Sequence, residues 1–374
     1  MFEEVALDHL SDLRILVLFS AKKFRKKWKI VADLSGAPVR FDALDALRGF
    51  AALAIAAGHV GLLPWESAFY LAVDFFLILS GFVLAHSYFD RKLIATHDFI
   101  ARRFLRMYPL HLITFLAFIF VYSVIGIEIN WADAVRHFFF VHNIGFGPEE
   151  ATFNIPSWTI SVEFWVNVIV FLLMMLIRNR WFQNFFLVAL AFCVYAVIAI
   201  KFGNLDVVTF DILGFANIGL MRCAAGFGIG VLIYRASHRA TTMRGHFGVQ
   251  LIAAIAFAVP IVFFSRTGML QFISPALFAF TIWVLSENSG PLAQRLSSLK
   301  RLGDISFALY ITHWGILLLI NALYPDLLMD IVLQIISLCI FLVVAEGTHR
   351  FLEIPLYRGG LAATRDWRNK PMLT

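Results

Sequence analysis

The sequence predicts an all-α, polytopic membrane protein with about ten transmembrane helices and with both termini in the cytoplasm. Three observations support this prediction. The 374-residue chain is 60% hydrophobic, only 15% of its residues are charged, and its mean hydropathy is +0.80. A soluble protein of this length would need far more polar surface. The three cysteines (Cys193, Cys223 and Cys339) fall inside apolar runs without disulfide or metal-ligand spacing, so ordinary packing is predicted for them.

Ten apolar runs are each long enough to cross a bilayer. They lie at residues 43–63, 68–88, 109–127, 157–177, 183–201, 214–234, 247–265, 269–286, 304–323 and 327–346. We therefore predict one membrane domain over residues 41–358. A basic cytoplasmic lead-in at 1–40 precedes it, and a cytoplasmic tail at 359–374 follows it.

The basic residues orient the chain, because cytoplasmic segments of membrane proteins are enriched in lysine and arginine. With the N-terminus inside, the inner segments hold most of these residues, from the cluster at Lys22–Lys29 to Arg350 and Arg358 near the end. The outer segments hold only Arg136, Lys201 and Arg266. The net charge of +6 thus belongs to the membrane edges, and no nucleic-acid partner is predicted.

The stretch from Phe41 to Leu63 carries ionisable residues on an otherwise apolar helix. Asp45 and Arg48 are three residues apart and share a face. Arg48 and His59 are about three turns apart, roughly 16 Å along the axis, and share a face too. Such a stripe has to face protein, water or a ligand, since lipid would not tolerate it. An internal ion pair with a histidine that fixes helix packing is the structural alternative.

Two carboxylates are candidate partners for His59. Asp74 lies near the outer end of the second span, and Glu163 lies inside the outer boundary of the fourth. A carboxylate that holds an imidazole in one tautomer and stabilises its cation is the usual second member of a histidine-centred site. A helix cap or a packing role is the structural alternative for either one.

A basic group stands at the inner face, where the segment HDFIARRFLRMYP forms a short helix that runs into the third span. It contains Arg102, Arg103, Arg106 and Tyr108. Several guanidinium groups on one face match the oxygens of phosphate. Ordinary positive-inside charge is the alternative explanation.

Further polar residues lie within the apolar spans and in the long outer loop. Ser161 lies on the fourth span, Arg222 on the sixth, where it needs an anionic partner, and His313 on the ninth. The outer loop at about 128–156 contains Trp131, His137, His142, Asn143 and the acidic pair Glu149–Glu150. A loop of this length is more often functional than filler. No common nucleotide, hydrolase or zinc-protease motif is present, and no metal site is predicted.

Six segments in order resemble the acyltransferase-3 family of bacterial membrane acyltransferases. They are FDALDALRGFAALAIAAGH, VDFFLILSGFVL, RRFLRMYPLH, SWTISVEFW, ISFALYITHW and HRFLEIPLYR, and they cover residues 41–358. The resemblance implies a ten-span core that takes an acetyl or other short acyl group from cytoplasmic acyl-CoA. It also implies that Arg48 and His59 are essential, and that Arg102–Tyr108 and Ser157–Glu163 are functional.

The residues and the resemblance together give one expected mechanism. The phosphates of acyl-CoA, a co-substrate and not a permanent cofactor, bind Arg48, Arg102, Arg103 and Arg106. His59 serves as general base or as acyl acceptor, oriented by Asp74 or Glu163. The acceptor is a glycan or lipid-linked saccharide that enters from outside, and the membrane is the bacterial inner membrane. A secondary transporter and a non-catalytic partner in polysaccharide export are the alternatives.

Overall fold

The computed structural model describes residues 40–64, 66–89, 96–145, 151–211, 216–237, 242–325 and 327–369. The predicted lead-in at 1–40, apart from Arg40, and the pair Glu149–Glu150 lie outside these residues. Within the described part of the chain the structure is helical and contains no β-strand, which confirms the predicted fold class.

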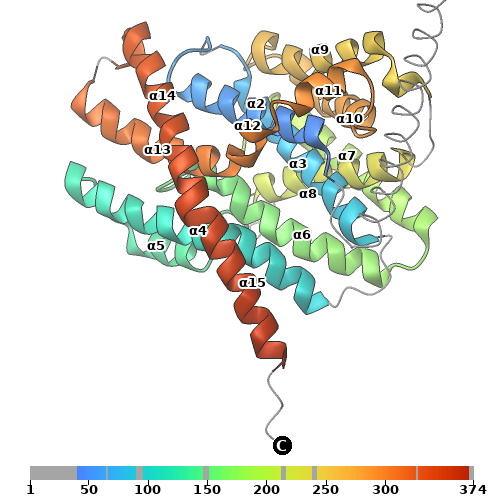
Figure 1. The fold of residues 1–374 in the computed structure, drawn as a ribbon, viewed down its shortest axis with the longest axis horizontal. Helices are drawn as coiled ribbons and strands as arrows, with labels where there is room; N and C mark the ends of the chain where they lie inside the picture. The colour runs from blue at the N-terminus through green and yellow to red at the C-terminus, as the bar shows by residue number, and fades with distance from the viewer. Residues whose placement is uncertain are drawn as a thin grey trace, which may run out of the picture. The chain divides into compact units, whose positions relative to one another are not determined.

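Each of the ten predicted spans corresponds to a helix (Figure 1). These are α2 (Asp42–His59), α3 (Ala72–Leu84), α4 (Thr96–Ile125), α6 (Trp158–Leu176), α7 (Arg180–Phe202), α8 (Ile218–Ser237), α9 (Phe247–Phe263), α10 (Ser274–Leu285), α13 (Ser306–Leu323) and α14 (Ile331–Thr348). Among the described residues, seven helical runs are long and apolar enough to cross a membrane. Helices α9 and α10 are shorter, and α2 carries Asp42, Asp45 and Arg48.

The described residues form four further α-helices: α5 (Trp131–Phe138), α11 (Pro291–Ser297), α12 (Lys300–Asp304) and α15 (Ile354–Asn369). Helix α4 begins at Thr96, so the predicted basic helix and the third span are one continuous element with Pro109 inside it. Helix α14 continues through a π-turn (His349–Glu353) into α15, which crosses the predicted domain boundary at residue 358.

Side-chain caps set the start of several helices. The side chain of Asn179 accepts hydrogen bonds from the backbone N–H groups of Trp181 and Phe182, and Asp330 caps α14 in the same way. Such caps satisfy donors that have no partner inside the helix, which matters most where little water is available. Helix α7 ends at Phe202, and Gly203, whose φ is +70°, forms its left-handed C-cap.

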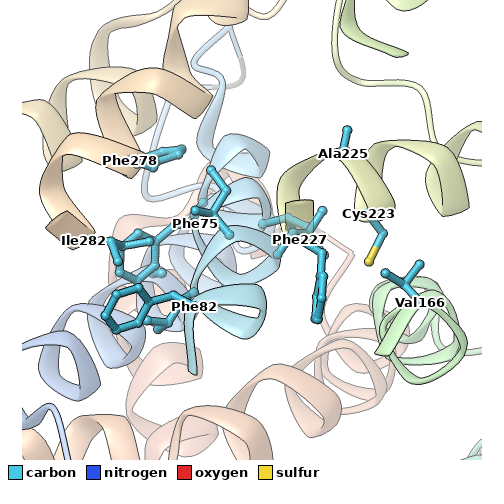
Figure 2. Packing of buried hydrophobic residues seen from close by; sticks show 14 of the residues in the cluster. Phe75, Phe82, Val166, Cys223, Ala225, Phe227, Phe278 and Ile282 are labelled. Carbon is cyan, nitrogen blue, oxygen red and sulfur yellow. The ribbon is translucent and has the colours of Figure 1, made fainter. Parts of the chain in front are cut away.

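Helix α3 is the most enclosed of the spans. In the most apolar part of the helical run Phe69–Tyr88, which contains α3, 72% of the residues are buried. The corresponding value for α7 is 22%. Phe75 and Phe82 of α3 lie beside Phe278 and Ile282 of α10 (Figure 2). A helix that is apolar on every side belongs in the middle of a bundle, whereas the exposed phenylalanines of α7 are suited to lipid.

Close approach between α3 and α8 depends on two glycines. A Cβ at Gly81 would stand 2.0 Å from the carbonyl oxygen of Phe227, and a Cβ at Gly230 would stand 2.0 Å from that of Ile78. Small residues let helix backbones approach each other in membranes. Neither clash is relieved by a side-chain rotation, because the obstructing atoms belong to the backbone.

We therefore expect Gly81→Ala and Gly230→Ala to destabilise the protein by about 3 kcal/mol or more each, the upper end of the usual overpacking cost. The measurement is the thermal unfolding midpoint of the purified protein in detergent. Gly248→Ala is the matched control, since its Cβ would meet nothing within 4 Å. Equal midpoints for all three variants would show that α3 and α8 do not pack this closely.

Candidate functional site

His59 stands at the C-terminal end of α2 and contacts His313 of α13. The distance between His59 Nδ1 and His313 Nε2 is 3.0 Å. Phe69 and Trp314 pack edge-on against the His59 ring. His313 is fully buried, whereas His59 is partly exposed. Two predicted site residues that are 254 positions apart in the sequence are therefore in contact.

The hydrogen bonds of His313 define the tautomers of both rings. His313 Nδ1 lies 3.0 Å from the carbonyl oxygen of Leu309, which can only accept. A neutral imidazole carries a single N–H, so His313 donates from Nδ1 and its Nε2 accepts from His59 Nδ1. His59 Nε2 then keeps a lone pair, and no described residue donates a hydrogen bond to it. A general base or a nucleophile requires such a lone pair.

Arg48 fixes α2 against the junction of α12 and α13. Its Nε donates to Ser306 Oγ at 3.0 Å, and its Nη2 donates to the carbonyl oxygen of Gly303 at 2.7 Å. Asp45 Oδ1 lies 3.4 Å from Arg48 Nη1, which confirms the predicted shared face. Arg48 thus connects the helix that carries His59 to the helix that carries His313.

Asp74 has a different partner from the one that the sequence suggested. Arg222 donates to both of its carboxylate oxygens, from Nε at 2.9 Å and from Nη2 at 2.5 Å. Both side chains are almost completely buried, and Arg222 Nη1 also donates to the carbonyl oxygen of Leu205 at 2.6 Å. The anionic partner expected for Arg222 is therefore Asp74, and His313 takes the position beside His59.

Glu163 also lies apart from His59 in its contacts. Its Oε1 accepts a hydrogen bond of 2.6 Å from Ser80 Oγ of α3. It interacts electrostatically with Arg103 of α4 as well. The structure therefore groups Glu163 with the basic residues of α4.

The basic group on α4 is largely uncompensated. No described residue makes a hydrogen bond or a close ion pair with Arg102, Arg103 or Arg106. Arg106 is exposed and the other two are partly exposed. Tyr108 uses its hydroxyl to donate to the carbonyl oxygen of Phe138 at 2.8 Å, and its ring stacks on Phe104.

The described residues of the connection between α4 and α6, which the sequence predicts to be an outer loop, pack against both helices. They include α5, which lies beside α4 in Figure 1. Ser161 Oγ and Trp165 Nε1 of α6 both donate to the carbonyl oxygen of Phe140, each at 3.0 Å. His137 and His142 of this segment approach His111 of α4, a residue to which sequence reasoning gave no role.

These features define a class: a polytopic helical membrane protein with a paired imidazole at the end of one span and a basic cluster on another. Sequence comparison adds the family. The chain belongs to the acyltransferase-3 family, whose acyltransferase domain matches residues 41–346.

Several individual proteins are similar to parts of the chain. It is 37% identical over 147 residues to acyltransferase MdmB of Streptomyces mycarofaciens, 34% of this chain and 37% of that protein. It is 48% identical over 84 residues to protein 2 in the picA locus of Rhizobium radiobacter, 20% of this chain and 42% of the relative. It is 24% identical over 351 residues to O-acetyltransferase OatA of Staphylococcus aureus, 86% of this chain and 58% of that protein. The chain thus spans less than two thirds of each relative. No solved structure matches it significantly.

Proposed function

We propose that this protein is a membrane O-acyltransferase of the bacterial inner membrane. It moves an acetyl or other short acyl group from cytoplasmic acyl-CoA to a hydroxyl of a cell-surface or exported glycan. The observation that carries this proposal is the contact between His59 and His313, which leaves His59 Nε2 with a lone pair. The names of two relatives, acyltransferase and O-acetyltransferase, support the reaction class.

The lone pair of His59 Nε2 serves acyl transfer in either of two ways. As general base it takes the proton of the acceptor hydroxyl while that oxygen attacks the thioester carbonyl. The carbon–sulfur bond then breaks, and the thiolate of CoA takes the proton from His59. As nucleophile His59 Nε2 attacks the thioester carbonyl, the carbon–sulfur bond breaks, and CoA leaves as the thiolate. The acceptor oxygen then attacks the acyl carbon and displaces the imidazole, and the hydroxyl proton passes to the CoA thiolate. Trapping a radiolabelled acyl-enzyme without acceptor distinguishes the second route from the first.

We assign His313 as the positioning residue for His59. Its Nε2 accepts from His59 Nδ1 and so directs the reactive lone pair to the opposite side of the ring. Arg48 supports this arrangement by joining α2 to the start of α13. Asp74 and Arg222 form a separate internal pair, which has a structural role.

Three arginines of α4 are the proposed donor-phosphate site: Arg102, Arg103 and Arg106. Their charge has little compensation from the described residues, and a guanidinium group is well matched to phosphate oxygens. The positive-inside rule favours a cytoplasmic location for them. Glu163, which interacts with Arg103, belongs to this donor side of the site.

Arg102→Ala and Arg106→Ala are expected to raise KM for acetyl-CoA by about tenfold or more each, since a charged hydrogen bond is worth about 1.5–3 kcal/mol. The turnover number should change much less, because the substitutions remove binding and not chemistry. The assay measures radiolabelled acetyl transfer from acetyl-CoA by the full chain in proteoliposomes.

Arg178→Ala is the matched control, because Arg178 is an exposed arginine that the predicted topology also places on the inner side. An unchanged KM in both α4 variants would remove the arginines from the donor site. Failure of the wild-type protein to hydrolyse or transfer from any acyl-CoA would contradict the proposed function as a whole. It would leave a transporter as the better explanation of the polar residues.

A further inference from the structure

Three buried imidazoles gather where α4, α5 and the following segment meet. They belong to His111 of α4, His137 of α5 and His142, and their side chains are between 1% and 9% exposed. Their ring centroids are separated by 3.9 to 5.9 Å. One ring nitrogen from each residue lies within 4.8 Å of the other two. We call these residues the histidine cluster.

The Nε2 atoms of the histidine cluster already have partners. His111 Nε2 lies 3.1 Å from the carbonyl oxygen of His137, and His142 Nε2 lies 3.1 Å from that of Ser157. A carbonyl oxygen only accepts, so both Nε2 atoms carry a hydrogen and both Nδ1 atoms keep a lone pair. His137 Nε2 is 3.1 Å from Thr152 Oγ1, which permits the same tautomer.

The Nδ1 atoms have no such partner. All three are buried, and none has a hydrogen-bond partner among the described residues. Leaving a buried polar atom unpaired costs about 1–3 kcal/mol. Three neighbouring rings that each carry an unpaired Nδ1 therefore indicate a bound group that accepts lone pairs.

The chemistry of the three donors favours a cation. Neutral imidazoles are metal ligands, and a set made only of nitrogen donors suits zinc and its neighbours better than magnesium or calcium.

We propose that His111, His137 and His142 bind a transition-metal dication such as Zn²⁺, which holds the α5 segment against α4. Each ligand has the outer hydrogen bond that metal-bound histidines usually make, to a backbone carbonyl or a hydroxyl. Three protein ligands leave a fourth position for water or another oxygen. This site is distinct from His59 and goes beyond the proposed acyl transfer.

Binding requires a modest rearrangement of the rings. In a tetrahedral zinc site, bonds of about 2.0–2.1 Å place nitrogen donors about 3.3 Å apart. The rings are nearly parallel, with interplanar angles of 3° to 12°, so their lone pairs do not yet meet at one point. Rotation of at least one ring about χ2 brings them together, and this torsion is broad for histidine.

The test measures metal in the full-length protein, purified in detergent with a tag that contains no histidine. After loading with Zn²⁺ and removal of free metal, we expect about one equivalent per chain by mass spectrometry of the metal. The Zn²⁺-loaded protein should unfold at a higher temperature than the chelator-treated protein. Co²⁺ loading should give the visible absorption of a site with nitrogen ligands and low coordination number.

Variants locate the site. His111→Ala, His137→Ala and His142→Ala should each lose the metal and the Zn²⁺-dependent rise in unfolding temperature. His97→Ala is the matched control, because His97 is an exposed histidine on the same helix as His111. It should retain both properties.

If a variant fails to fold, the stoichiometry and the Co²⁺ spectrum of the wild-type protein test the proposal by themselves. Wild-type protein that binds less than about a tenth of an equivalent would overturn the proposal, as would full metal retention in all three variants.

Discussion

Replacing His59 by alanine is expected to lower the turnover number for acetyl transfer by about 10³-fold or more. The structure gives His59 Nε2 the only free lone pair of the imidazole pair, since His313 uses both of its ring nitrogens. Removing this lone pair removes the base or nucleophile from the proposed reaction. The measurement is single-turnover transfer of radiolabelled acetyl to the acceptor in proteoliposomes.

Two further variants separate chemistry from folding. His313→Asn should reduce turnover by about 10–100-fold and shift the pH profile, because His59 loses the group that fixes its tautomer. His97→Ala, on the exposed face of α4, should leave turnover unchanged. If His59→Ala folds normally and still transfers acetyl groups at the wild-type rate, His59 has no catalytic role.

Breaking the ion pair between Asp74 and Arg222 is expected to produce the largest loss of stability. Arg222→Met leaves the carboxylate of Asp74 buried without its cation, and Asp74→Leu leaves the guanidinium group without its anion. Removal of one partner from a buried pair costs about 3–5 kcal/mol. The unfolding midpoint in detergent and the yield of folded protein measure this loss.

The double variant Asp74→Leu/Arg222→Met should recover most of the lost stability. Replacing a whole buried pair by apolar side chains is often neutral, since neither charge remains unpaired. Leu205 loses one hydrogen bond to Arg222 in the process, so recovery is expected to be incomplete. Single-variant losses that simply add in the double variant would show that the two residues are not coupled.

The sequence alone was sufficient for the helices and for part of the site. Long apolar runs determine where the helices lie, because a backbone in lipid has to satisfy its own hydrogen bonds. The spacing of Asp45 and Arg48 likewise predicted a contact within one helix, which the structure confirms. These are properties of single segments, and local periodicity reports them directly.

Partners on different helices could not be predicted in the same way. The sequence predicts that Asp74 and His59 lie at the outer ends of neighbouring spans, which suggested a pair. Packing of α3 against α8 instead pairs Asp74 with Arg222. The contact of His59 with His313 depends on how α2 meets α13, which hydropathy does not determine. His111 lies in a motif used for the family resemblance, but only the folding of α5 back onto α4 brings it near His137.

The continuous helical run from Ile331 to Thr364 has a mechanical consequence. Its 34 residues extend for roughly 50 Å, whereas the hydrocarbon layer is about 30 Å thick. The run must therefore lean within the bilayer or extend into the headgroup layer. Its last part, α15, packs on α4 beside the arginines, with Gly360 close to Leu105. Lipid thickness would thus act on the proposed donor-phosphate site, since a change in the lean of this helix moves α15 against α4.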